Sequence, residues 1–313
     1  MIISASRRTD IPAFYSSWFF NRLKEGFVYV ANPFNAKKIT RIDLTPEAVD
    51  IFVFWTKDPE PMVRRLEELK HYQYYFQFTL TSYREDIEKG IRAKRDIIDT
   101  FKNLADTIGK EKVIWRYDPI LINDFYSKEY HYYWFEKFCS ELEGYTENCI
   151  ISFLDMYKKI ESNMKAIKIK NLSKEENMEI AKELVSIASK YHIKIKACCE
   201  DMNLTWVGVE RASCIDENLI CKIIKSPINV KKDSGQRPGC TCVKSIDIGS
   251  YNSCNHGCNY CYANFNGTLV RKNILNHDDN SPILIGKIKG DEDIIIKNME
   301  RVTISEEQLK FLK

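Results

Sequence analysis

Short runs of aliphatic, β-branched and aromatic residues alternate along the chain with longer segments whose apolar residues recur at helical spacing. The runs predict eight strands, at 2–6, 27–31, 50–56, 74–81, 112–117, 149–154, 192–197 and 243–248. Helices are expected between them, over 11–25, 60–71, 85–108, 128–142, 173–190 and 216–225. Asp10 and Gly26 are typical of the two ends of the first helix, and Ser173 and Glu176 have capping-box spacing.

This alternation predicts an α/β fold with a parallel sheet, and eight strands suit a (β/α) barrel, complete or partial. An open doubly wound sheet is the alternative, but the glycine fingerprint expected after its first strand is missing. We expect residues 1–263 to form the barrel, with a cysteine-rich loop after the last strand. Residues 264–313 are more polar and are expected to form a small C-terminal appendage.

Polar residues follow most of the predicted strands, at the ends where a parallel barrel carries its active site. Their repetition predicts one shared polar mouth, although each residue alone is also typical of a helix cap or an ion pair. Arg116 is an example, because it lies between two aromatic residues and two positions before Asp118, with which it would pair. The strand-end residues that we expect to bind a cofactor are Ser4, Ser6, Arg7, Lys57, Arg116, Asp155 and Glu200.

Composition limits the class of partner. The 313 residues include 47 Lys and Arg against 44 Asp and Glu, and a net charge of +3 is too small to indicate a nucleic acid or a membrane. No run approaches the roughly 18 apolar residues of a membrane span, and the N-terminus lacks the pattern of a signal peptide. We therefore expect a cytoplasmic protein. The five histidines are dispersed, which disfavours histidine-based hydrolysis.

Cysteine is the informative residue. There are 11, none precedes Cys139, and five fall between Cys240 and Cys261. In a reducing cytosol such clusters are more often metal ligands than disulfides. In the run 254–261, three cysteines at C-x3-C-x2-C spacing could bind three irons of a [4Fe–4S] cube and leave the fourth open. A zinc site completed by His256 or another cysteine is the alternative.

The run 254–261 matches the C-x3-C-x-aromatic-C motif of the radical S-adenosylmethionine superfamily. The resemblance implies that Cys254, Cys258 and Cys261 bind a [4Fe–4S] cluster and that the open iron binds S-adenosylmethionine, with Tyr260 placed to stack on the adenine. It also implies an electron donor such as flavodoxin or ferredoxin. Most members carry the motif after the first strand. In a barrel the loop after strand eight lies beside the loop after strand one, so a permuted order would keep the geometry.

The whole chain resembles an uncharacterised bacterial family with radical S-adenosylmethionine affinity, through residues 4–10 and 247–251. That resemblance implies no particular reaction. The polar strand ends favour a polar or charged substrate, which leaves a peptide, a nucleotide and a small molecule open. The alternative function is a non-enzymatic iron–sulfur or zinc protein that acts as a redox sensor or binds nucleic acid through its lysines.

Four other cysteines form a second candidate metal site. Cys240 and Cys242 are a tight pair, and Cys198 and Cys214 follow predicted strands or precede helices, with Cys199 as the substitute for Cys198. Four thiolates suit an auxiliary [4Fe–4S] cluster or structural zinc, whereas the competing interpretation is that some of them are small buried apolar residues. The cysteines assigned to the core are Cys139, Cys149 and Cys221.

Overall fold

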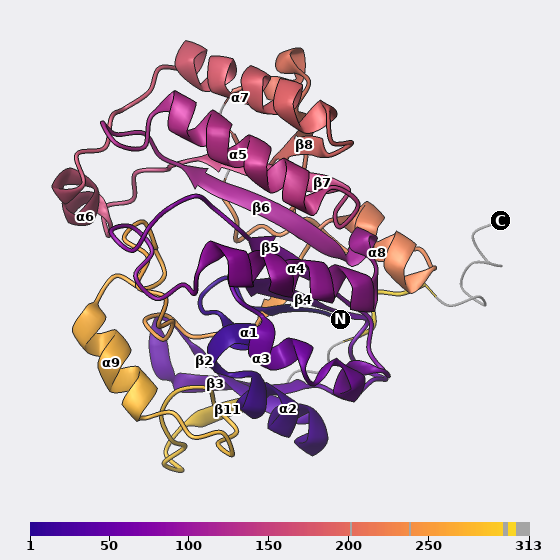
Figure 1. Ribbon diagram of the computed structural model, residues 1–313. Helices are drawn as coiled ribbons and strands as arrows, with labels where there is room; N and C mark the ends of the chain where they lie inside the picture. The colour runs from indigo at the N-terminus through magenta and orange to yellow at the C-terminus, as the bar shows by residue number, and fades with distance from the viewer. Residues whose placement is uncertain (201, 238, 297–299, 305–313) are drawn as a thin grey trace.

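The computed structural model describes the whole chain except residues 201, 238, 297–299 and 305–313 (Figure 1). Its main element is an eight-stranded sheet in which every neighbouring pair is parallel, so the predicted α/β class is confirmed. The strands, in spatial order, are β10 (Ile246–Asp247), β1 (Ile2–Ala5), β4 (Ile51–Thr56), β5 (Tyr74–Thr79), β6 (Val113–Ile120), β7 (Asn148–Phe153), β8 (Lys194–Ala197) and β9 (Glu210–Arg211).

The strand order distinguishes the two predicted architectures. From β1 to β9 each new strand of this sheet is added on the same side, as in a barrel, whereas a doubly wound sheet reverses direction. The sheet is nevertheless open, because β9 and β10 are its edges and no pairing joins them among the described residues. A complete barrel is therefore not formed. Both edge strands have only two residues, which gives them little backbone with which to close the sheet.

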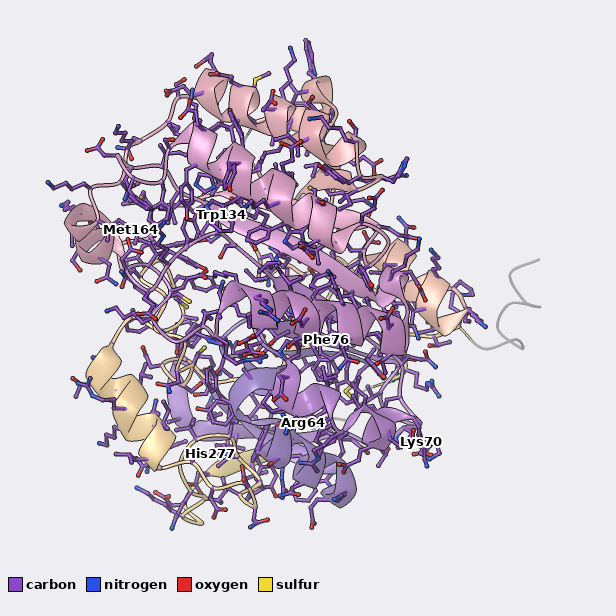
Figure 2. All side chains as sticks on the ribbon, in the orientation of Figure 1. Arg64, Lys70, Phe76, Trp134, Met164 and His277 are labelled. Carbon is purple, nitrogen blue, oxygen red and sulfur yellow. The ribbon has the colours of Figure 1, made fainter. Side chains whose placement is uncertain are left out.

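Three long helices cover one face of the sheet. They are α4 (Lys94–Ile108), α5 (Lys128–Leu142) and α7 (Lys174–Ser189), and Figure 1 shows α5 and α7 side by side. Large side chains of the strands, such as Phe54, Phe76 and Trp115, lie in the main core together with buried residues of these helices. Phe76 is buried and lies in the middle of the molecule in Figure 2, whereas the exposed Lys70 lies at its rim. Burial of this apolar surface is the main stabilising term.

The opposite face of the sheet has its own, smaller core. It is formed by the alternate strand residues, such as Ile51, Tyr75 and Ile114, because successive side chains of a strand point to opposite faces. Helix α8 (Glu217–Ile224) packs here through Ile220 and Ile223. The chain between β9 and β10 therefore covers this face, which we call the inner face of the sheet.

The predicted strand at 27–31 forms, but in a second sheet. It is β2 (Phe27–Asn32), which pairs antiparallel with β3 (Asn35–Asp43), and β11 (Asp293–Ile296) then pairs parallel with β3. We did not predict β3 because its first half is polar and exposed, without a buried apolar run. The segment after residue 263 also supplies α9 (Gly267–Leu275), and the Ser281 carbonyl accepts a hydrogen bond from Trp18. The boundary at 263 stays a prediction.

Local signals at helix ends held in most places. The predicted helix 11–25 is two helices, α1 (Ile11–Phe14) and α2 (Ser16–Glu25), with Asp10 as the N-cap and Gly26 in the left-handed C-cap. The Ser173–Glu176 capping box is present at α7. The predicted helix 85–108 is wrong over its first part, because α4 begins only at Lys94.

The remaining helices are short. The predicted helix 60–71 is α3 (Glu60–Val63) followed by a 3₁₀ turn, Leu66–Leu69. Helix α6 (Glu161–Ala166) and two further 3₁₀ turns, Lys110–Lys112 and Leu204–Val207, complete the set among the residues described. In that part of the chain, a helix with the length and apolar character needed to cross a bilayer was not found.

Candidate functional site

The three-cysteine loop follows β10, at the end of the sheet where the neighbouring strand β1 also ends. Strand β10 runs parallel to β1, and Asp247 at its end accepts hydrogen bonds from Ser4 Oγ (3.1 Å), Ser6 Oγ (2.6 Å) and the Arg7 backbone N–H (2.8 Å). Gly249 approaches so closely that a Cβ there would lie 2.0 Å from Ser6 Oγ. Ser4 and Ser6, which we predicted as cofactor ligands, therefore hold the start of the cysteine loop against β1.

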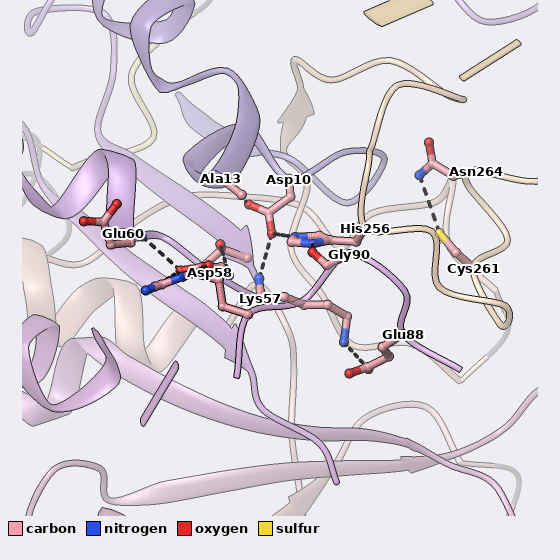
Figure 3. A network of polar contacts seen from close by, with 12 residues as sticks. Asp10, Ala13, Lys57, Asp58, Glu60, Glu88, Gly90, His256, Cys261 and Asn264 are labelled. Atoms are coloured by element: carbon pink, nitrogen blue, oxygen red, sulfur yellow. Dashed lines mark hydrogen bonds and ion pairs between the residues drawn. The ribbon is translucent and has the colours of Figure 1, made fainter. Parts of the chain in front are cut away.

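The three cysteines of the loop face one another at a distance. Cys254 interacts electrostatically with both Cys258 and Cys261, yet the three sulfur atoms, all on described residues, are not all within 4.8 Å of one another. Asn264 fixes the two ends of the motif, because its side chain accepts from the Cys254 N–H (2.8 Å) and donates to Cys261 Sγ (3.5 Å, Figure 3). Asn264 thus ties the first cysteine of the motif to the last.

A segment after β5 clamps the middle of the cysteine loop. The Gly90 N–H donates to the His256 carbonyl (2.8 Å), and the Asn259 N–H donates to the Ile87 carbonyl (2.9 Å). A Cβ at Gly90 would lie 2.7 Å from the backbone oxygen of Asn255, so glycine alone permits this approach. We predicted this segment as helix. A glycine at position 90 was the available signal against that prediction.

His256 is engaged away from the cysteines. Its Nε2 lies 2.8 Å from Asp10 Oδ2 and its Nδ1 lies 3.1 Å from the Gly90 carbonyl, so both ring nitrogens contact an oxygen (Figure 3). Asp10 Oδ2 also accepts the Lys57 backbone N–H at 2.7 Å. His256 is buried, and binding a metal would cost it one of these two partners. The arrangement disfavours a zinc site completed by this histidine.

A buried carboxylate beside the loop was not predicted. Glu88 accepts hydrogen bonds from Lys57 Nζ (2.8 Å), Lys94 Nζ (2.9 Å), Thr81 Oγ1 (2.7 Å) and the Tyr260 hydroxyl. Burial acts to raise the pKa of Glu88, but the ammonium groups of Lys57 and Lys94 hold that pKa well below its usual range. In the sequence, Glu88 looks like a solvent-exposed position of a helix.

Lys57 and Tyr260, both predicted as cofactor ligands, meet at Glu88 and Cys258. The ammonium nitrogen of Lys57 lies 5.4 Å from the centre of the Tyr260 ring. Burial raises the pKa of the Cys258 thiol to about 12, and the Lys57 charge acts against that rise. Burial lowers the pKa of Lys57, but the charges of Glu88 and Cys258 outweigh it and the net shift is upward. A fixed positive charge therefore lies beside one thiol of the motif.

The second set of cysteines comes together on the inner face of the sheet. The sulfur atoms of Cys198, Cys240 and Cys242 all lie within 4.8 Å of one another, and the three residues are buried. The Cys214 thiol hydrogen-bonds with those of Cys198 and Cys242, and these bonds, with help from Arg116, hold the pKa of Cys214 well below its usual range. Three of the four predicted members, Cys198, Cys240 and Cys242, are thus gathered in one group, and Cys214 lies beside it.

Arg116 belongs to this second region. Its guanidinium donates to Cys214 Sγ (3.3 Å) and to Gln77 Oε1 (3.2 Å), and it forms an ion pair with Asp118. Its carbon Cζ lies 5.2 Å from the centre of the Trp55 ring, as expected for a stacked arginine. Arg116 therefore pairs with Asp118 and contacts a cysteine of the second set at the same time.

The remaining predicted ligands have protein partners. Arg7 donates to Ser245 Oγ (3.1 Å) and lies over Trp55, and Asp155 forms an ion pair with Arg237. Glu200 accepts the Phe153 backbone N–H at 3.1 Å. Of the three cysteines that we predicted to lie in the core, Cys139 and Cys149 are buried, whereas Cys221 is half-buried on α8.

Fold and site together define an α/β protein with an open parallel sheet and two separate groups of cysteines. A family model described as "Domain of unknown function (DUF1848)" matches residues 2–263, and the chain belongs to that family. No curated protein and no solved structure is similar enough to the chain to count as a match.

Proposed function

We propose that this protein is a radical S-adenosylmethionine enzyme in which Cys254, Cys258 and Cys261 hold a [4Fe–4S] cluster with one open iron. The observation that carries the proposal is the three-cysteine loop itself, clamped at the strand-end edge while its only histidine is bound to Asp10 and Gly90. A [4Fe–4S] cluster bound by three cysteines has a fourth iron without a cysteine, and that iron is available to bind a further molecule.

The residues present fit such a cluster. Each cysteine of a cube binds a different iron, so the sulfurs must stand further apart than around a single ion. The sulfurs of Cys254, Cys258 and Cys261 are not all within 4.8 Å of one another, which is compatible with that requirement. The Asn264 and Gly90 contacts fix the loop before any metal binds, which lowers the entropy cost of ordering it.

When bound, such a cluster and S-adenosylmethionine supply a reductive cleavage that begins hydrogen abstraction from a substrate. The chain's own residues have separate tasks. Lys57 places a positive charge near Cys258 and thereby stabilises its thiolate, while Glu88 holds Lys57 in position. Tyr260 is oriented through its hydroxyl by Glu88, and its ring lies beside Lys57 and Tyr83. The substrate is proposed to be polar, as the charged strand ends suggest.

Anaerobic reconstitution tests this proposal. The wild type and Cys258→Ala are loaded with iron and sulfide, reduced with dithionite and examined by electron paramagnetic resonance with and without S-adenosylmethionine. We expect the cofactor to change the wild-type signal and 5′-deoxyadenosine to form, and both effects to be absent in Cys258→Ala. The matched control is Cys221→Ala, which removes a half-buried thiol outside both groups.

Two results would overturn the proposal. One is a wild-type chain that binds no iron on reconstitution. The other is a cluster whose signal does not respond to S-adenosylmethionine and which yields no 5′-deoxyadenosine. The second outcome would favour a non-enzymatic iron–sulfur protein.

A further inference from the structure

We infer that Cys198, Cys214, Cys240 and Cys242 form a closed site for one Zn²⁺ ion, which joins the two open edges of the main sheet. This inference does not rest on the proposed function, because none of its residues belongs to the three-cysteine loop. It also chooses between the two kinds of metal that four cysteines would suit, namely a single ion and an iron–sulfur cube.

The arrangement of the sulfurs carries the choice. Cys198, Cys240 and Cys242 form one triangle with all sides within 4.8 Å. Cys214 interacts with both Cys198 and Cys242, so its sulfur lies beside that triangle, although the four sulfurs are not all within 4.8 Å of one another. Four sulfurs bound to one zinc at about 2.3 Å stand about 3.8 Å apart, and the triangle of Cys198, Cys240 and Cys242 is compatible with that spacing. A cube places its four cysteines on four different irons, which needs a wider spread.

The surroundings are those of a structural ion. Three of the four cysteines are buried, which leaves little room for water or substrate to reach a metal. The Ile215 N–H donates to Cys242 Sγ (3.4 Å), and Arg116 donates to Cys214 Sγ (3.3 Å). Such donors lower the excess negative charge of four thiolates around a divalent ion and fix their orientation. Closed four-cysteine sites of this kind are typical of structural zinc.

The position of the four ligands gives the ion a task. Cys198 follows β8 and Cys214 follows β9, whereas Cys240 and Cys242 precede β10 at the other edge. The segments that carry them already touch, because the Val243 N–H donates to the Ile215 carbonyl (3.2 Å). A metal held by all four would therefore tie β8 and β9 to the segment that leads into β10. The metal would thereby connect the β9 side of the sheet to the β10 side, which hydrogen bonds between strands connect in a closed barrel.

Metal analysis provides the first test. The wild type and the triple variant Cys254→Ala/Cys258→Ala/Cys261→Ala are expressed with added zinc and iron, and metals are measured after dialysis against a weak chelator. We expect one zinc per chain in both proteins, and no iron in the triple variant. About four irons per triple-variant chain, or no bound metal in either protein, would overturn the inference. Failure of the proposed function would instead leave the zinc count unchanged.

Cobalt substitution provides a second test that does not need a variant to fold without metal. Co²⁺ replaces the zinc, and the sulfur-to-metal charge-transfer absorption is measured, since its intensity rises with the number of thiolates bound. We expect a four-thiolate spectrum for the wild type and for Cys221→Ser, and about three quarters of that intensity for Cys214→Ser. Equal intensity in Cys214→Ser and the wild type would remove Cys214 from the site and overturn the four-ligand assignment.

Discussion

The two cysteine groups differ in how the chain builds them. The first lies within one loop of eight residues, 254–261, and its three half-buried cysteines do not have all their sulfurs within 4.8 Å of one another. The second is assembled from separate parts of the chain, and its sulfurs lie close together, mostly buried. On the proposed function, the first group would leave one iron open to a further molecule, because its loop supplies three cysteine ligands. A site that collects ligands from several segments holds those segments together.

The largest expected effect is a reciprocal loss of two properties. Cys258→Ala should reduce 5′-deoxyadenosine formation to the background rate while zinc content and thermal stability stay those of the wild type. Cys242→Ala should lose the zinc and at least about 3 kcal/mol of the free energy of unfolding, since structural zinc contributes about 10–16 kcal/mol in isolated peptides. Metal analysis, product assay and urea unfolding measure the three quantities. The comparison breaks if Cys258→Ala loses zinc or Cys242→Ala keeps it.

The next largest effect concerns the charge beside the first group. Glu88→Gln leaves Lys57 buried without its partner, and breaking a buried ion pair costs about 3–5 kcal/mol. Equilibrium urea unfolding at pH 7 measures that loss. Lys37→Gln is the control, because its ion pair with Asp291 is exposed.

Acidity gives the same residue a second test. The folded pKa of Glu88 is lowered, so its contribution to stability is present above the ordinary carboxyl pKa of about 4.3. It is lost progressively as the pH falls below that value toward the folded pKa. The gap in unfolding free energy between the wild type and Glu88→Gln should therefore narrow from pH 7 to pH 3. A constant gap would show that the carboxylate charge has no part in it.

Glu88 also marks the limit of what the sequence predicts. The α/β class and most strands of the main sheet were predictable, because both depend on alternating apolar runs. The second group was predictable in part, because strand ends of a parallel sheet converge. Glu88 contacts residues as distant as Tyr260, and no local pattern in its own segment indicates that contact. Strand β3 was also not predicted, because its first half is exposed and polar and therefore lacks an apolar pattern.

A smaller effect is expected where the backbone of the clamp touches the cysteine loop. Gly90→Ala would place a Cβ 2.7 Å from the Asn255 backbone oxygen, and overpacking of this kind costs about 1–3 kcal/mol. Because the clamp contacts the three-cysteine loop and not the second group, the iron content of Gly90→Ala should fall as well, while its zinc content stays unchanged. Gly267→Ala is the matched control, since nothing lies within 4 Å of a Cβ there. Unchanged stability and cluster content in Gly90→Ala would show that the clamp does not position the loop.

The smallest effect is expected at the rim of the second group. Arg237 forms an ion pair with Asp155 in which both side chains are partly exposed, and such pairs contribute about 0.2–1 kcal/mol. Arg237 also hydrogen-bonds with Cys199, the residue next to Cys198 in the chain. If the closed site holds its ion through four cysteines alone, Arg237→Ala should change stability by no more than that amount and leave zinc affinity intact, as measured by competition with a chromophoric chelator. A tenfold loss of zinc affinity in Arg237→Ala would instead show that Arg237 helps to hold the ion. The second group would then not bind its ion through four cysteines alone.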